Sequence, residues 1–425
     1  MKFNYKNSGI SEHELAEEGK KLASVISEMK TIAERNDYGD CFASINLPFD
    51  SEISQDIKDL AEQYKNINYI LVIGIGGSNL GTVAVYEAVL GKLYNLKGNF
   101  PEILFADAAD PEYISDIKNI IRKCLEREEN VLINCVSKSG TTTETAANFE
   151  IFLDIIKKYK KNYNDYIVAT TDEGSRLWSL AKKNKFKILK IPQNVGGRFS
   201  VFSAVGLFPL IIAGIDTVQL LKGARCMRNK CLDPDIYKNP AAISAIITYL
   251  QYKRNKNIIV NFFFSSDLES TGKWLGQLTA ESIGKEKNLK GEVVNAGMTP
   301  AVATAVDLHS MSQLYLAGPP DKFTNFMRLE NNENDIVIPA GKFAGKTLSE
   351  ITNAIIHGVQ EAYIKRKIPF NEIVLENKSE KCLGEFLQFK MMETIFLGHL
   401  LEINPFDQPN VEEYKVGTRR ILEGE

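Results

Sequence analysis

Short runs of aliphatic and β-branched residues alternate with amphipathic stretches along most of the chain. The runs are almost continuously apolar, which is typical of parallel strands buried on both faces. They begin at Tyr69 (YILVIGI), Glu102 (EILFADA), Asn130 (NVLINCV), Tyr166 (YIVAT) and Phe186 (FKILKI). This alternation of strands and helices predicts an α/β unit with a mainly parallel sheet.

The same pattern starts again after a helical region. Residues 199–252 predict helices, and the uncharged stretch 199–215 within them is too short for a membrane span and contains Gly and Pro. Strands are expected again at Asn257 (NIIVNFFF), Gly291 (GEVVNAG) and Asn334 (NDIVIPA). We therefore expect a second α/β unit, packed on the first with a cleft between the two.

The N-terminal segment predicts a helix, because Ser11 followed by Glu14 is a capping box. No apolar stretch follows the first lysines, so no secretory signal is expected and the protein should remain in the cytoplasm. The 51 Lys and Arg residues and 54 Asp and Glu residues give a net charge of −3 over 425 residues. This balance favours a soluble globular protein of two or three domains and offers no basic surface for nucleic acid.

Cysteine and histidine usage makes a metal site improbable. The six cysteines form no CxxC pair, and the four histidines have no HxxxH or HExxH spacing. We expect reduced structural cysteines and chemistry that depends mainly on other side chains.

A glycine-rich segment, IGIGGSNLG at residues 73–81, leaves the first strand and enters a helix. Glycines let backbone amides approach a ligand closely, and the helix N-terminus attracts negative charge. A dinucleotide site would need a glycine at the position of Asn79. It would also need an acidic residue at the tip of the next strand, about 20 residues further on, to hold the ribose, and none is expected there. A phosphate or sugar loop is favoured over an NAD site, and a tight turn without a ligand is the alternative.

A second segment, SKSGTTTE at residues 137–144, follows the strand NVLINCV. Its hydroxyl groups and glycine can offer several donors to one phosphate monoester, whereas the Walker lysine spacing for a triphosphate is absent. The alternative is a helix cap rich in Ser and Thr, but a cap uses only one hydroxyl.

Single residues in other segments complete the candidate chemistry. Arg198 follows two glycines at the start of an apolar segment, where a buried cation needs an anionic partner. That partner is either a carboxylate in a structural salt bridge or a negative charge that develops in a transition state. Gln277 and Glu281 are four residues apart on one helix, so the carboxylate is a candidate general base or an ordinary surface group. His309 and Lys415 justify no assignment in isolation, because core histidines and solvated lysines are common.

Six motifs in this order resemble the glucose-6-phosphate isomerase (phosphoglucose isomerase) family over about residues 71–415. They are IGIGGSNLG, SKSGTTTET, GGRFSVFSAVG, QLTAESIGK, DLHS and NPFDQPNVEEYK. The resemblance implies two sugar-isomerase (SIS) domains, each a mainly parallel sheet flanked by helices in three α/β/α layers. It also implies a homodimer without metal or organic cofactor that interconverts glucose 6-phosphate and fructose 6-phosphate, in glycolysis and gluconeogenesis, through ring opening and an enediolate.

The resemblance assigns a role to each matching position. Glu281 matches the glutamate that moves a proton between C1 and C2, and Arg198 matches the arginine facing the enediolate. Gln277 matches a substrate-contacting glutamine, and His309 and Lys415 match the ring-opening pair, with His309 reaching the site from the neighbouring subunit. The positions implied to bind the phosphate and the sugar are Gly77, Ser78, Ser137, Lys138, Ser139, Thr142 and Gly197.

Two positions depart from the family pattern. Asn410 stands where a glycine usually follows Asp-Gln-Pro, and asparagine tolerates the left-handed conformation, so the turn should persist. Gly140 replaces a bulkier residue of some relatives, which predicts a slightly different phosphate loop. The expected domains are a helical segment 1–45 on the second domain, a first SIS domain 46–205, a second SIS domain 206–400, and a segment 401–425 returning to the active site.

Two other functions stay open at this level. One is a related SIS isomerase that accepts mannose 6-phosphate as well as glucose 6-phosphate. The other is a non-catalytic regulator that binds a sugar phosphate, although no basic helix-turn-helix for DNA is found. A dehydrogenase is a more distant alternative because the dinucleotide pattern fails.

Overall fold

The computed structural model describes residues 1–294 and 299–424. The chain divides into two compact units: unit 1 comprises Met1–Thr31 and Lys222–Pro405, and unit 2 comprises Ile32–Leu221 and Phe406–Glu425. Residues 32–45 and 206–221 thus group with unit 2, whereas the sequence placed them with the other domain. Helix α8 (Ala204–Ile212) explains part of this difference, because it packs on the sheet of unit 2.

Unit 2 contains a sheet of five parallel strands in the order β3-β2-β4-β5-β6. All five were expected from the apolar runs, and this part of the prediction is confirmed. Pairing is in register, with Ile73 of β2 opposite Ala106 of β3 and Cys135 of β4. The strands are β2 (Tyr69–Ile73), β3 (Glu102–Ala106), β4 (Val131–Val136), β5 (Ile167–Thr171) and β6 (Lys187–Lys190).

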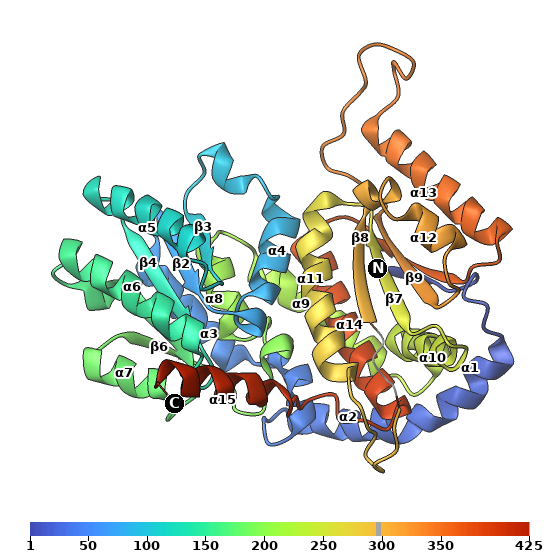
Figure 1. The fold of residues 1–425 in the computed structure, drawn as a ribbon, viewed down its shortest axis with the longest axis horizontal. Coiled ribbons are helices and arrows are strands. Elements are labelled where there is room, and N and C mark those ends of the chain that lie inside the picture. Colours follow the sequence, from blue (N-terminus) through green and yellow to red (C-terminus); the bar gives the residue numbers. More distant parts are fainter. Residues whose placement is uncertain (295–298, 425) are drawn as a thin grey trace. The chain divides into compact units, whose positions relative to one another are not determined.

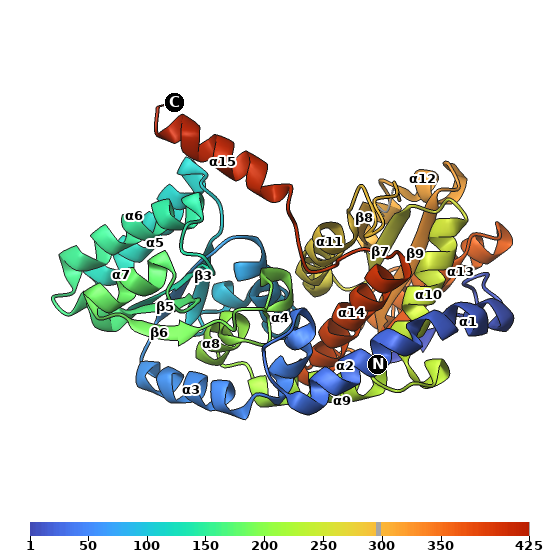
Figure 2. The same ribbon diagram turned by 90° about the horizontal axis from the view of Figure 1, so that it is seen from below.

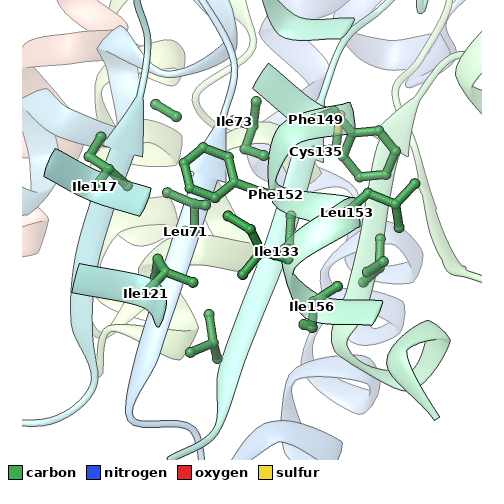
Figure 3. Packing of buried hydrophobic residues seen from close by; sticks show 14 of the residues in the cluster. Leu71, Ile73, Ile117, Ile121, Ile133, Cys135, Phe149, Phe152, Leu153 and Ile156 are labelled. Carbon is green, nitrogen blue, oxygen red and sulfur yellow. The ribbon is translucent and has the colours of Figure 1, made fainter. Parts of the chain in front are cut away.

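Helices cover both faces of this sheet, which makes three layers (Figure 1). On one face, Leu71 and Ile133 pack against Ile117, Phe152 and other apolar side chains (Figure 3). The helices on this face are α5 (Pro111–Glu126), α6 (Thr143–Tyr159) and α7 (Arg176–Asn184). The other face holds α8 together with α3 (Ser51–Ala61) and α4 (Leu80–Leu90).

The end of the chain adds one more helix to unit 2. Helix α15 (Val411–Leu422) has no buried residue and stands away from the sheet of its own unit (Figure 2). Asn410, at its N-cap, has φ −72° and ψ −17°, so this position needs no left-handed conformation. The turn persists, but for a different reason from the one that the sequence indicated.

Unit 1 contains a five-stranded sheet in the order β1-β10-β9-β7-β8, in which only the pairing of β1 with β10 is antiparallel. Val260 and Phe262 face α12 and α13, whereas Phe263 faces α14. The strands are β1 (Lys2–Asn4), β7 (Ile258–Phe263), β8 (Thr299–Thr304), β9 (Lys322–Leu329) and β10 (Phe370–Leu375). The helices are α1 (Glu12–Gly19), α10 (Pro240–Lys253), α11 (Glu269–Ile283), α12 (Ser312–Ala317), α13 (Leu348–Lys365) and α14 (Glu380–Leu400), while α2 (Ala23–Arg35) and α9 (Thr217–Cys231) cross the unit boundaries.

The second set of strand predictions is only partly correct. β7 is confirmed, but NDIVIPA forms no strand: Ile336 and Val337 are 62% and 58% exposed, and Val337 makes only an isolated bridge to Thr347. These residues belong to the extension that precedes α13 (Figure 1). The run expected at Gly291 forms no strand over residues 291–294. Its remaining residues, 295–297, lie outside the described part of the chain.

The expected α/β architecture with two mainly parallel sheets flanked by helices is confirmed. The N-terminal capping box is also present, since the Ser11 side chain and the Glu14 side chain each bond the other's backbone amide. Stretch 199–215 contains the buried helix α8 (Ala204–Ile212), with Pro209 inside it. Among the helices in residues 1–294 and 299–424, none is long and apolar enough to cross a membrane.

Candidate active site

The carboxyl ends of β2 and β4 define the candidate site of unit 2. β3 lies on one side of β2, and β4 lies on the other side. The chain therefore adds β3 in one direction along the sheet and β4, β5 and β6 in the opposite direction, which makes the gap between β2 and β4 a switch point. Ligands of open parallel sheets bind at such a switch point, beyond the carboxyl ends of the strands. The loops at this point are residues 74–81 and 137–142, the two segments that the sequence singled out.

The loop of residues 137–142, which we call the phosphate loop, pairs its hydroxyl groups with one another. Ser139 Oγ lies 2.8 Å from Thr141 Oγ1, and Ser137 Oγ lies 3.5 Å from Thr142 Oγ1. Thr142 is the N-cap of α6, but its side chain makes no capping hydrogen bond. The amides in the first turn of α6 therefore keep their capacity to bind an anion, which argues against the helix-cap alternative.

Gly140 shapes the phosphate loop. Its φ of +68° lies in the left-handed region, and its amide donates to Ser137 Oγ at 3.1 Å. A Cβ atom at this position would lie 2.3 Å from the Leu177 backbone nitrogen at the start of α7. A larger residue would require a different path for the loop, as the departure from the family pattern suggested.

Groups beneath the phosphate loop hold it in place. Thr171 Oγ1 donates to Ser137 O at 2.6 Å, and the Asp172 amide donates to Lys138 O at 3.2 Å. Burial raises the pKa of the Asp172 carboxyl to about 6, and the Lys138 ammonium opposes this rise. Burial also lowers the pKa of Lys138, against the charge of Asp172. The side chain of Lys138 contacts backbone carbonyls of the segment after β6, which the sequence did not indicate.

The glycine-rich loop approaches the segment that contains Arg198. A Cβ atom on Gly77 would lie 2.2 Å from the Gly197 carbonyl carbon, so these two backbones need glycine at position 77. Ser200 Oγ donates to Gly197 O at 2.7 Å and to Gly77 O at 3.3 Å, which fixes the contact. Ser78 is half-buried on the same loop.

Asp107 stands at the tip of β3, where the sequence led us to expect no acidic residue. Its Oδ2 atom accepts a hydrogen bond from Asn79 Nδ2 at 3.1 Å. The carboxylate thus contacts the glycine-rich loop itself, and Asn79 still occupies the place of the third glycine of a dinucleotide motif.

Arg198 is 2% exposed and lies in unit 2 together with the C-terminal segment. Its Nη1 donates to Gln408 Oε1 at 2.6 Å and its Nη2 donates to Asp407 O at 3.3 Å. The guanidinium also lies 5.5 Å from the centre of the Phe199 ring. Gln408 was missed as a functional candidate, although it belongs to the quoted NPFDQPNVEEYK motif.

Glu281 and Gln277 lie together on α11 of unit 1. Gln277 Nε2 donates to Glu281 Oε1 at 2.9 Å, as their spacing of four residues predicts. Trp274 and Leu278 are buried on the same helix, so α11 is anchored in the core as expected. Glu281 is half-buried and its carboxylate is oriented by the glutamine.

His309 and Lys415 belong to different units; His309 is exposed, whereas Lys415 is half-buried. His309 follows a capping box in which Asp307 Oδ2 accepts from the Thr304 amide at 2.7 Å. Lys415 lies on α15 and forms a 2.7 Å ion pair with Glu412, its side chain being 39% exposed. Exposed pairs of this kind are worth only about 0–1 kcal/mol, so the lysine can exchange this partner for another anion.

Comparisons with known proteins agree with these motifs. The family model described as phosphoglucose isomerase matches residues 50–424. The glucose-6-phosphate isomerase of Carboxydothermus hydrogenoformans is 35% identical, with 95% of this chain and 88% of that protein covered. A probable glucose-6-phosphate isomerase of Methanococcus maripaludis is 34% identical, with 100% and 93% covered.

Solved structures show the same fold. A hypothetical protein from Thermus thermophilus matches with a TM-score of 0.86 and 30% identity, covering 99% of both chains. A glucose-6-phosphate isomerase from Chlamydia trachomatis matches with a TM-score of 0.83 and 23% identity, covering 99% of this chain and 88% of that one. The chain belongs to the phosphoglucose isomerase family.

Proposed function

We propose that this protein is a glucose-6-phosphate isomerase, which interconverts glucose 6-phosphate and fructose 6-phosphate in glycolysis and gluconeogenesis. The observation that carries this proposal is the family match over residues 50–424, supported by relatives of that name over nearly the full chain. The residues that we assign to the chemistry are those whose sequence motifs resemble the family. We also propose a cytoplasmic homodimer, for which the family provides the only support.

Proton transfer falls to Glu281, with Arg198 as the electrophilic partner. The Glu281 carboxylate removes the proton from C2 of the open aldose, and the electron pair moves into the carbonyl to give a cis-enediolate. The same carboxylic acid then returns the proton to C1, while the hydroxyl proton moves between O1 and O2. The arginine stabilises the oxygen charge that develops, and Gln277 keeps the carboxylate oriented through its 2.9 Å hydrogen bond.

Ring opening precedes this step, and we assign it to His309 and Lys415. The cyclic sugar needs an acid at the ring oxygen and a base at the anomeric hydroxyl. An imidazole can exchange a proton near neutral pH, and an ammonium can donate one. The proposed assignment places the histidine of one subunit in the site of its partner.

The phosphate group is assigned to the phosphate loop. Three observations support this: the hydroxyls do not cap α6, the first-turn amides point out of the helix, and the loop ends a strand at the switch point. Gly77, Ser78 and Gly197 are assigned to the sugar side. The residues proposed to contact the phosphate through hydroxyls are Ser137, Ser139 and Thr142.

Thr142→Val tests the phosphate assignment because it removes one hydroxyl and keeps the side-chain shape. A hydrogen bond to a charged group is worth ~1.5–3 kcal/mol, so KM and the inhibition constant of inorganic phosphate should rise about 10- to 100-fold. Thr143→Val, one residue further along α6, is the matched control. A crystal grown in sulfate should show the anion on the loop; hydroxyls turned to cap α6, with binding unchanged in the variant, would contradict the assignment.

A coupled assay tests the proposed reaction directly. Fructose 6-phosphate is supplied with EDTA, and the glucose 6-phosphate formed is followed through a dehydrogenase that reduces NADP. We expect turnover without added metal. Absence of turnover in protein that still binds fructose 6-phosphate would replace the enzyme with the sugar-phosphate-binding alternative.

A further inference from the structure

Lys138 differs from the other members of the phosphate loop in where its side chain points. Its Nζ donates to Gln193 O at 2.5 Å and to Val195 O at 3.0 Å. An ammonium has three donors and no acceptor, so two of the three are used on main-chain carbonyls. The side chain thus connects the loop after β4 with the segment after β6.

This segment leads directly to Arg198. Val195 closes a turn by donating its amide to Pro192 O at 3.0 Å, and two glycines separate it from the arginine. Gly197 is in turn packed on the backbone of Gly77. The approach to Arg198 is therefore held by Lys138 at one point and by the glycine-rich loop at another.

The surroundings of Lys138 fit a positioning contact. Thr171 and Asp172 fix the backbone at its base, so the lysine extends from a rigid point. Its side chain is partly buried, and carbonyl oxygens replace the water that burial removes. The phosphate loop has hydroxyls and amides for an anion without this ammonium.

We propose that Lys138 is a positioning residue, which ties the phosphate loop to the segment that carries Arg198. The inference rests on the proposed isomerase function, because it concerns how that site places its arginine. The Lys138 side chain then links the loop that holds the phosphate to the segment that positions the Arg198 guanidinium at the enediolate. Loss of the connection should affect turnover more than phosphate affinity.

Lys138→Met removes the donors and keeps most of the stem. Misplacement of a reacting group by about 1 Å can cost about 100-fold, so kcat should fall by about that factor. KM and the inhibition constant of inorganic phosphate should change less than about threefold, the pattern of a contact that acts on the transition state. Lys138→Arg, which restores donors to both carbonyls, should recover kcat to within about tenfold of the wild type. Lys187→Met, at an exposed position of β6, is the matched control.

Hydrogen exchange gives a second readout that needs no turnover. The Val195 and Phe199 amides, which bond to Pro192 O and Gly196 O, should exchange faster in Lys138→Met and at wild-type rates in Lys138→Arg and Lys187→Met. Unchanged exchange in Lys138→Met would overturn the inference. So would a phosphate inhibition constant raised about tenfold or more with kcat intact, which would make Lys138 a direct phosphate ligand. If the wild type proves inactive as an isomerase, the proposed function fails, and exchange still decides whether Lys138 holds the segment.

Discussion

Glu281→Gln should abolish exchange of the C2 proton with solvent while sugar-phosphate binding persists. The amide has the shape of the carboxylate and can still accept the hydrogen bond from Gln277, but it cannot remove a proton from carbon. Loss of a general base costs about 10²–10⁴-fold in rate. The rate is measured by NMR as loss of deuterium from C2-labelled glucose 6-phosphate, and binding by titration calorimetry with fructose 6-phosphate.

Glu286→Gln is the matched control, since it makes the same change of charge at an exposed position just beyond α11. It should exchange the C2 proton at the wild-type rate. If Glu281→Gln retains activity within a few-fold of wild type, another group is the base. If it loses binding as well as exchange, its role is to hold the sugar.

Mixing two inactive variants should restore about a quarter of wild-type activity if His309 acts across a dimer. In a two-fold dimer each site draws on both chains. A heterodimer of Glu281→Gln and His309→Ala chains then has one site with both lesions and one site with neither. Half of the dimers are heterodimers after random exchange, and half of their sites are intact, which gives about one quarter of all sites. The coupled assay before and after subunit exchange measures the recovery.

His309 is exposed, so a neighbouring subunit can reach it. If the histidine acted within its own chain, every site would keep one lesion and no activity would return. Native mass spectrometry of differently tagged chains shows whether heterodimers have formed. Heterodimers without recovered activity would contradict the shared site while leaving the isomerase assignment intact.

The sheet of unit 2 could be predicted because its central strands are dense apolar runs. β2 and β4 are buried along their whole length, so every position reads as apolar or small apart from Asn134. Asn134 is tolerated because its Nδ2 donates to Thr170 Oγ1 at 2.9 Å and to Val168 O at 3.2 Å. One internal polar residue therefore did not obscure the pattern.

The strands of unit 1 are harder to recognise because polar side chains interrupt them. Asn325 and Asn371 interrupt β9 and β10, and they form a buried ladder with Asn261 of β7. Asn325 Nδ2 donates to Asn261 Oδ1 at 3.3 Å, and Asn371 Nδ2 donates to Asn325 Oδ1 at 3.4 Å. These amides pair across neighbouring strands, and such cross-strand pairing cannot be read from one sequence. β8 is obscured by Pro300, which an edge strand tolerates. NDIVIPA misled for the opposite reason, since its apolar residues are exposed on the extension.

The candidate site shows a similar division between what sequence indicates and what folding adds. The phosphate loop could be predicted because it directly follows a strand. The contact between Gln277 and Glu281 could be predicted because the two residues are four positions apart on one helix. The contacts of Arg198 with Gln408 and of Lys138 with Val195 join residues 210 and 57 positions apart. Distant contacts of this kind depend on the folded chain and have no periodic signal.

Because unit 1 is built from both early and late parts of the chain, its sheet cannot be completed until late in protein synthesis. Within the described residues, β1 (Lys2–Asn4) pairs with β10 (Phe370–Leu375) alone, so the first strand emerges from the ribosome long before its partner exists. At about 5–20 residues per second, roughly 20–70 s separate the two. Throughout that interval the nascent chain carries a strand without its partner, and an unpaired strand edge can pair with other chains. The last segment of unit 2, with Lys415, arrives later still.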